Sequence, residues 1–190
     1  MERPSLLVLV RHAESLRNRV KKHNTYFPDE ESRMFVKGIA DHKIPLTEFG
    51  IEQSIMKVRM SHLIRERNPG FTYDMTGEEA EAAFPWLQEY WETCGGFFAT
   101  PPGGESLELT SLRVYLFLNM LFREKAGDRV LVVNHGGTIR CFRFLLEKWN
   151  YDQAEKWPSG QSPQNCGFTV YEYEHSKKRL ELKEYNTVCW

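Results

Sequence analysis

The sequence has little cysteine and no pattern that would use it to bind a metal. Its four cysteines, Cys94, Cys141, Cys166 and Cys189, are widely spaced in 190 residues and form no CxxC pair. Because zinc sites usually draw on such close pairs, no zinc site is expected. In a chain without a secretion signal, the thiols are predicted to be reduced rather than paired in disulfides.

Long hydrophobic runs and an excess of one charge are also absent. The apolar run at residues 6–10 is short for a signal peptide and is interrupted by Arg11 and His12. No stretch approaches the length that crosses a bilayer. The net charge is −1 and the pI about 6.6, so neither a membrane nor a nucleic acid is expected as a partner. These features predict a cytoplasmic location.

The hydrophobic content, 41% with 13% aromatic residues, is enough for one substantial core. We therefore predict a single domain over residues 1–190, with insertions at about 19–43 and 71–104. The first insertion is polar and irregular, apart from a weak helical stretch near residues 30–37. It is either a lid or binding loop, or a solvated surface excursion.

Several helices are predicted from capping residues and apolar spacing. Thr47 should cap a helix that runs to about residue 61, and Thr76 with Glu79 forms a capping box that opens a helix ending at Ala83. The longest helix should begin at residue 106 or 108 and end near 125. The residues expected on its buried face are Leu109, Leu112, Leu116 and Met120.

Two apolar strands end in a histidine and continue into a helix. The first, at residues 6–10, leads to Arg11 and His12; the second, at residues 129–134, leads to His135, Gly136 and Gly137. Thr138 is expected to cap the helix after the second strand. If the strands are parallel neighbours, both imidazoles lie at one edge of the sheet, where open α/β sheets bind ligands. Two further strands, at residues 168–174 and 179–185, should form a C-terminal hairpin.

The residue types at these strand ends suit a phosphate. Helix N-termini offer backbone N–H groups and a positive dipole end, and glycine lets the backbone approach an anion. Arg11 is a planar donor for phosphate oxygens, and Glu105 follows a Gly-Gly loop just before a helix. Together they supply a nucleophile, anion donors and a proton donor, which is what phosphoryl transfer to an imidazole requires.

At these residues the chain resembles the histidine phosphatase superfamily, which is also called phosphoglycerate mutase-like. The R-H-[GA]-E-[ST] signature matches residues 11–15, and Asn18 matches the asparagine that often follows it. P-L-T-x-x-G matches residues 45–50, G-E-S matches 104–106, and x-H-G matches 134–136. Residues 63–66 with Gly70 also resemble the L-R-E…G segment of that family.

The resemblance implies an α/β fold, a three-layer α/β/α sandwich whose mostly parallel sheet is flanked by helices. It implies a phosphatase in which His12 becomes a phosphohistidine, Arg11 and His135 hold the phosphoryl oxygens, and Glu105 protonates the leaving alcohol. Asn18 is implied to contact phosphate or substrate, and Gly136 to lie in the phosphate site. No metal and no other cofactor is implied. The implied partner is a small-molecule phosphomonoester, and a homodimer is left open.

The sequence departs from the family between the helix opened at Thr47 and residue 63. The family has a strand there, followed by an S-x-x-x-R-[AT]-x-x-T helix with a second phosphate-binding arginine, and roughly thirty residues are absent by comparison. The chain as given omits that segment, or carries a deletion, or Arg59 or Arg65 has taken over the role. Three functions therefore stay open: a phosphatase, a phosphoglycerate mutase, and a catalytically impaired protein that binds phosphate ligands.

Overall fold

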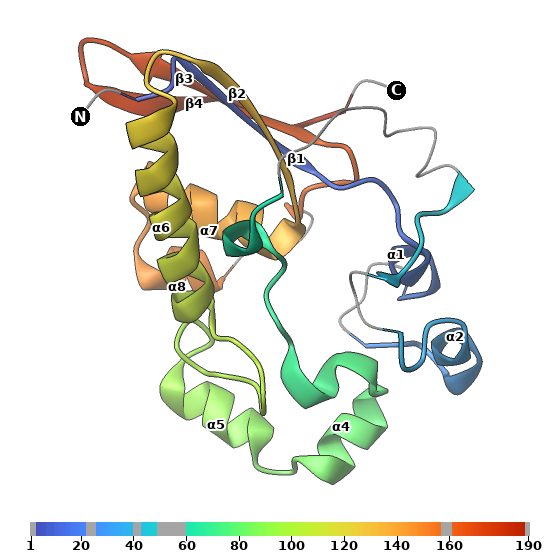
Figure 1. Cartoon of the computed structure of the whole chain (residues 1–190). Coiled ribbons are helices and arrows are strands. Elements are labelled where there is room, and N and C mark those ends of the chain that lie inside the picture. Colours follow the sequence, from blue (N-terminus) through green and yellow to red (C-terminus); the bar gives the residue numbers. More distant parts are fainter. Residues whose placement is uncertain (1–2, 22–25, 40–42, 49–59, 157–160, 189–190) are drawn as a thin grey trace. The chain divides into compact units, whose positions relative to one another are not determined.

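The computed structural model describes residues 3–21, 26–39, 43–48, 60–156 and 161–188 (Figure 1). The chain divides into two compact units. The first comprises Met1–His12, Arg59–Arg67 and Leu107–Trp190, and the second comprises Ala13–Val58 and Asn68–Ser106. Both segments that the sequence suggests as insertions fall within the second unit.

The first unit contains a four-stranded sheet. Its strands are β1 (Leu6–Arg11), β2 (Arg129–Asn134), β3 (Phe168–Glu174) and β4 (Arg179–Thr187), in the order β2-β1-β3-β4. The α/β class and the C-terminal hairpin are confirmed. The sheet is mixed, however, rather than mostly parallel. β1 pairs in parallel with β2, whereas the hairpin packs beside β1 and adds two antiparallel pairings.

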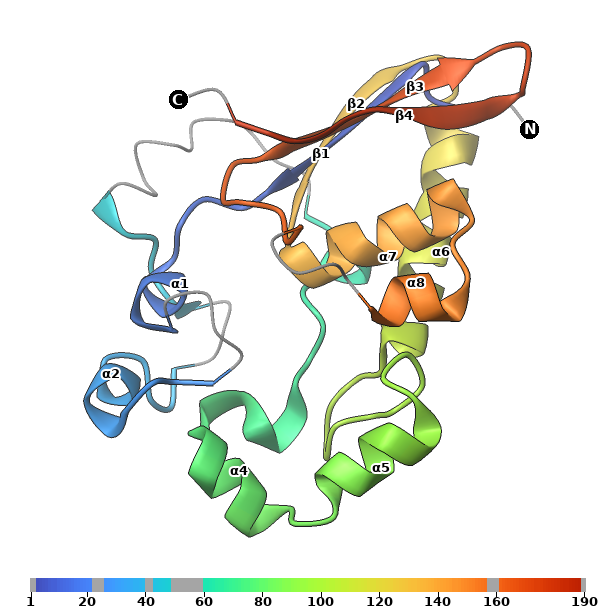
Figure 2. The same ribbon diagram turned by 180° about the vertical axis from the view of Figure 1, so that it is seen from behind.

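Three helices of the first unit lie on the same side of this sheet. They are α6 (Leu107–Glu124), α7 (Gly136–Glu147) and the short α8 (Tyr151–Glu155), as Figures 1 and 2 show. The unit also holds the 3-10 turn η2 (His62–Ile64). Along β1, Leu7 and Leu9 are fully buried, while Leu6 and Val8 between them are partly exposed. This alternation assigns one face of the sheet to the core.

α6 occupies the predicted residues but turns a different face to the core. Its buried residues include Val114, Phe117, Leu118 and Leu121, and Phe117 meets Phe142 of α7 edge-to-face at 5.9 Å between ring centroids. Leu109, Leu112 and Leu116 are instead about half exposed, so the predicted stripe is wrong. The helix carries apolar residues on two faces, and spacing alone does not distinguish them.

The second unit is built from short helices. The capping box predicted at Thr76 and Glu79 opens α4 (Gly77–Ala83), as expected. The helix predicted from Thr47 to residue 61 lies largely outside the described residues. The other elements are α1 (Leu16–Lys21), α2 (Glu30–Met34), η3 (Gly70–Asp74) and α5 (Leu87–Cys94).

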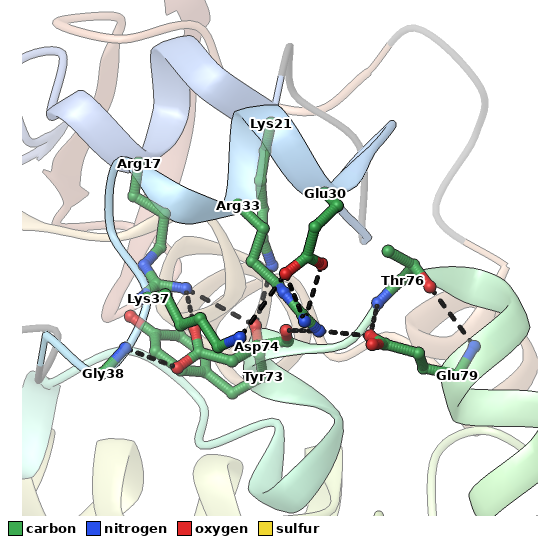
Figure 3. Close-up of polar contacts among 10 residues, drawn as sticks. All are labelled: Arg17, Lys21, Glu30, Arg33, Lys37, Gly38, Tyr73, Asp74, Thr76 and Glu79. Carbon is green, nitrogen blue, oxygen red and sulfur yellow. Dashed lines mark hydrogen bonds and ion pairs between the residues drawn. The ribbon is translucent and has the colours of Figure 1, made fainter.

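Two buried arginines join these elements within the second unit (Figure 3). Arg17 of α1 donates to Asp74 Oδ1 at 2.9 Å and lies over the ring of Tyr73 at 3.7 Å. Arg33 of α2 donates to the Asp74 carbonyl at 3.1 Å and pairs with Glu79. Because buried guanidinium groups need such partners, the contacts fix α1 and α2 against residues 73–79.

Three of the four cysteines are described, and all three are free thiols: Cys94 is exposed, Cys141 buried and Cys166 half-buried. Cys189 lies outside the described residues. Among the helices of the described ranges, none is both long enough and apolar enough to cross a membrane.

Candidate active site

The two strand-end histidines lie next to each other. β1 and β2 run in parallel with Arg11 opposite Asn134, so His12 and His135 both follow the same edge of the sheet. The His12 backbone N–H donates to the Asn134 carbonyl at 2.7 Å. The imidazole rings lie 4.7 Å apart between centroids and are tilted by 59°. The geometric expectation from adjacent parallel strands is therefore met.

Arg11 is held beside this pair by the chain that precedes β3. Its Nη1 donates to the Pro163 carbonyl at 2.8 Å, and Asn165 Nδ2 donates to the His12 carbonyl at 3.0 Å. Burial lowers the pKa of Arg11, and the charge of Glu66 opposes that shift. An arginine remains a cation after such a shift, so the site keeps a buried positive charge.

The helix after β2 begins earlier than predicted. α7 starts at Gly136 with His135 as its N-cap residue, and Thr138 lies in the first turn. The Thr138 hydroxyl accepts from the His135 N–H at 3.1 Å and donates to the His135 carbonyl at 2.9 Å. His135 therefore stands at the positive end of a twelve-residue helix, where an anion is stabilised.

Glu66 also belongs to this site, although the sequence assigned it no role. Its Oε2 accepts from the Gly137 N–H at 3.2 Å, and its Oε1 accepts from the Arg67 N–H at 2.8 Å. A methyl group on Gly137 would lie 2.4 Å from Oε1, so glycine is needed for this approach. The only sequence signal was the L-R-E…G resemblance at residues 63–66.

Arg113 of α6 holds the Glu66 segment in place. Its Nη1 donates to the carbonyls of Leu63 and Arg65 at 2.8 and 2.7 Å, and its Nη2 donates to the Glu66 carbonyl at 3.0 Å. These hydrogen bonds from one guanidinium hold the backbone of residues 63–66 in place, and with it the start of the Glu66 side chain.

Two other predicted site residues belong to the second unit, where each has a local contact. Glu105 Oε2 accepts from the Asn68 N–H at 3.0 Å. Asn18 Oδ1 accepts from the Ser15 N–H at 3.1 Å and from the Ser15 hydroxyl at 2.9 Å, and the Asn18 N–H donates back to that hydroxyl at 3.3 Å. This reciprocal arrangement stabilises the start of α1.

The first two family-like motifs also lie together in the second unit. Ser15 pairs with Leu46 in an isolated antiparallel bridge. The Thr47 hydroxyl, predicted to cap a helix, donates to Glu14 Oε1 at 2.8 Å. Residues 49–59, which include Arg59, lie outside the described ranges.

Residues 46–186 match the model of the histidine phosphatase superfamily, branch 1. The chain belongs to the histidine phosphatase superfamily. It is 30% identical to the 2,3-bisphosphoglycerate-dependent phosphoglycerate mutase of Parvibaculum lavamentivorans over 184 residues, which cover 80% of this chain and 84% of the relative. The alignment spans 184 positions but includes only 80% of the 190 residues of this chain. Roughly thirty positions of that relative therefore have no counterpart here. This agrees with the absent strand–helix segment.

Solved structures share the fold of this superfamily member. The phosphoserine phosphatase of Entamoeba histolytica, solved with phosphoserine, superposes with a TM-score of 0.66 at 18% identity and covers 96% of both chains. A mycobacterial glucosyl-3-phosphoglycerate phosphatase with inorganic phosphate superposes with a TM-score of 0.63 at 20% identity, over 96% of this chain and 97% of the other. At these identities the likeness establishes the fold.

Proposed function

We propose that this histidine phosphatase superfamily member hydrolyses a small-molecule phosphomonoester through a phosphohistidine at His12. The observation that carries the proposal is the pairing of the His12 and His135 imidazoles beside Arg11. An imidazole nitrogen of His12 attacks phosphorus, and the bond from phosphorus to the alcohol oxygen breaks. Water then attacks the phosphohistidine and releases inorganic phosphate.

The transferred phosphoryl group is stabilised by charges of the chain itself. Arg11 supplies a buried guanidinium, His135 a second imidazole, and Gly136 the first N–H of α7. Phosphoryl transfer depends largely on positioned positive charge, and a missing donor costs about 3–4 kcal/mol of transition-state stabilisation in comparable sites. The segment with the family's second arginine is absent, so Arg11 supplies a larger part of the positive charge that stabilises the phosphoryl group.

The leaving alcohol needs a proton, and two carboxylates are candidates to supply it. Glu105 is the one predicted from the G-E-S motif. Glu66 is supported by its contact with Gly137, next to His135, and by its electrostatic effect on Arg11. A general acid contributes roughly 10²- to 10⁴-fold in rate when the leaving group is basic.

The two carboxylates are distinguished by comparing Glu66→Gln with Glu105→Gln on two substrates. The glutamine variant of the residue that acts as the acid should hydrolyse an alkyl phosphate about 100-fold or more slowly than the wild type. Its rate with an aryl phosphate whose phenol is acidic should fall much less, because that leaving group departs without a proton. The variant at the other position should reduce both rates alike or leave them unchanged.

The main test is hydrolysis of a generic aryl phosphate in the presence of a metal chelator. We expect turnover, competitive inhibition by vanadate, and loss of activity in His12→Ala. Quenching the wild type in alkaline detergent should trap a protein-bound phosphate that is stable to alkali and is released in acid. A His12→Ala protein as active as the wild type would refute the proposal.

A second candidate is phosphoglycerate mutase activity, which is favoured by the identity to mutases at the 30% level. In that case the phosphohistidine returns its phosphoryl group to a sugar-acid alcohol instead of to water. Incubation with 3-phosphoglycerate and product analysis distinguishes the two: isomerised product indicates a mutase, and free phosphate indicates a phosphatase.

The absent segment favours a third candidate, a protein that binds phosphate ligands without turning them over. It predicts a phosphate-dependent rise in melting temperature with no hydrolysis of any phosphomonoester.

A further inference from the structure

Asn134 carries a buried amide that no polar group of the described residues satisfies. The residue is 2% exposed, and neither its Oδ1 nor its Nδ2 has a hydrogen-bond partner. A buried amide without partners costs about 1–3 kcal/mol, so such groups are rare and usually serve a purpose. Valine or alanine at the end of β2 would avoid this cost.

The adjacent strand has a second unsatisfied group at the same level. Arg11 Nε is buried and unpartnered, although Nη1 of the same guanidinium binds the Pro163 carbonyl. Arg11 lies directly opposite Asn134 in the parallel pairing of β1 with β2.

The alternation of side chains places these two groups on one face of the sheet. Leu9 lies opposite Val132, two positions before Arg11 and Asn134, and both are buried. Because side chains repeat every second residue along a strand, Arg11 and Asn134 extend from that same core face. One unpaired donor, Arg11 Nε–H, and one unpaired acceptor, Asn134 Oδ1, therefore lie on neighbouring strands.

We propose that Asn134 is a positioning residue for Arg11, and that it acts through one buried water. This inference rests on the proposed role of Arg11 in holding phosphate. The water accepts from Arg11 Nε–H and from Asn134 Nδ2–H and donates to Asn134 Oδ1, which gives it the two to four polar partners that buried waters have. The bridge keeps the guanidinium from rotating about its last bonds.

A neutral amide suits this task better than a carboxylate. It orients the guanidinium without cancelling the charge that attracts the phosphoryl group. An aspartate at the same place would form an ion pair with Arg11 and compete with phosphate for it. This contrast explains an otherwise costly asparagine at the end of a strand that is apolar before it.

The test compares Asn134→Thr with Asn134→Val, which have the same shape and differ in one hydroxyl. Thr169→Val is the matched control, since Thr169 Oγ1 is likewise buried and unpartnered but lies on β3, opposite Leu9. We expect Asn134→Val to weaken the binding of inorganic phosphate, measured by calorimetry, about tenfold relative to Asn134→Thr. The value of kcat/KM should fall in parallel. Thr169→Val should change neither quantity.

Asn134→Asp adds a readout that a purely structural role would not move. It should weaken phosphate binding while the new carboxylate is ionised, and part of the affinity should return once acid protonates that carboxylate. Equal phosphate affinity in Asn134→Val and Asn134→Thr, at similar melting temperatures, would overturn the inference. So would a wild-type protein that does not bind phosphate.

Calorimetry requires no turnover, so the outcome is independent of whether the proposed hydrolysis occurs. A chain that binds phosphate tenfold more weakly in Asn134→Val but hydrolyses nothing supports the role of Asn134 and refutes the proposed function. Hydrolysis by the wild type, together with equal phosphate affinity in Asn134→Val and Asn134→Thr, supports the proposed function and refutes the role of Asn134.

Discussion

At the scale of single residues, the two glycines at the start of α7 have different surroundings. A methyl group on Gly136 would meet its nearest neighbours at 4.0 Å, whereas one on Gly137 would lie 2.4 Å from Glu66 Oε1. The obstructing atom is the end of a flexible side chain, so the carboxylate should move rather than the backbone. Gly137 therefore determines where the Glu66 carboxylate lies.

We predict that Gly137→Ala lowers kcat toward the level of Glu66→Gln with little loss of stability. The gain in helix propensity, about 1 kcal/mol, offsets the lost hydrogen bond from the Gly137 N–H, which contributes about as much. Steady-state kinetics and thermal unfolding check both parts. Gly136→Ala is the matched comparison and should lower kcat less. Equal effects of the two alanines would contradict this role of Gly137.

From the buried thiol of Cys141 we predict a loss of stability at alkaline pH. Burial raises the pKa of its thiol from 9.0 to about 11. Above pH 9 the unfolded chain releases this proton while the folded chain retains it. The stabilisation is therefore fully present below about pH 9 and is lost as the pH rises toward 11, by up to roughly 3 kcal/mol.

Urea unfolding at pH 8, 9, 10 and 11 measures this slope. Cys141→Ala should be the less pH-sensitive protein across that range, while Cys94→Ala, at an exposed thiol, should keep the wild-type slope. Identical slopes for wild type and Cys141→Ala would show that another group governs alkaline unfolding.

At the scale of elements, α6 has apolar residues on two faces, and one of these faces packs against the core. Leu118 is 3% exposed and Leu112 is 57% exposed, although both are leucines of the same helix. We predict that Leu118→Ala lowers the free energy of unfolding by about 2–5 kcal/mol, because it leaves a cavity in the core. Leu112→Ala should change it by less than about 0.5 kcal/mol. Denaturant unfolding of both variants measures the difference, and equal losses would mean that α6 is turned otherwise.

The tether between α6 and the Glu66 segment gives a second prediction at this scale. Arg113 donates to three carbonyls of residues 63–66. Arg113→Met keeps much of the apolar stem but removes the donors, so the Glu66 carboxylate should lose its fixed position. Under the proposal that Glu66 is the acid, we expect kcat to fall by about tenfold with KM less affected, since a misplaced proton donor costs rate more than binding. Arg123→Met, at an exposed arginine of the same helix, is the control and should leave kcat unchanged.

At the scale of the whole molecule, each of the two units has its own buried arginine cluster. Arg33 links α2 to residues 74–79 in the second unit (Figure 3). In the first unit Arg143 forms two hydrogen bonds with Glu147, at 2.7 and 3.0 Å, and Glu147 also accepts from the Tyr171 hydroxyl at 2.7 Å. The contacts described for each cluster join elements of its own unit.

Hydrogen exchange should therefore localise the effect of each substitution. Arg33→Met removes the buried guanidinium that binds Glu30, Glu79 and the Asp74 carbonyl, and should speed amide exchange in residues 27–39 and 70–83, while β1 and β3 stay protected. Arg143→Met should act on α7 and β3 instead. If Arg33→Met speeds exchange equally in both units, the chain opens as one cooperative body.

The sequence was sufficient wherever the signal was local. Two six-residue apolar strands, the C-terminal hairpin and the capping box at Thr76 follow from alternation, turn residues and caps, which act over a few positions. The motifs around His12 and His135 identified the family, and the family model agrees. The functional roles of the site residues remain predictions: His12, His135, Arg11, Glu105, Asn18 and Gly136.

Two predictions about helices were wrong. The N-cap of α7 is His135 rather than Thr138, because the threonine hydroxyl binds the backbone of His135 from inside the first turn. The buried face of α6 was wrong, because a helix with apolar residues on two sides is oriented by what lies against it. Capping and periodicity do not carry that information.

The sequence by itself determined that this chain is a histidine phosphatase superfamily member with two histidines at the ends of neighbouring strands. Short-range patterns and ordered motifs were enough for that. Only the tertiary structure placed Glu66 against Gly137, 71 residues away, and Asn134 opposite Arg11 with both groups unsatisfied. Such relations depend on which surfaces meet when strands pair and helices pack, and the local preferences of the chain do not encode them.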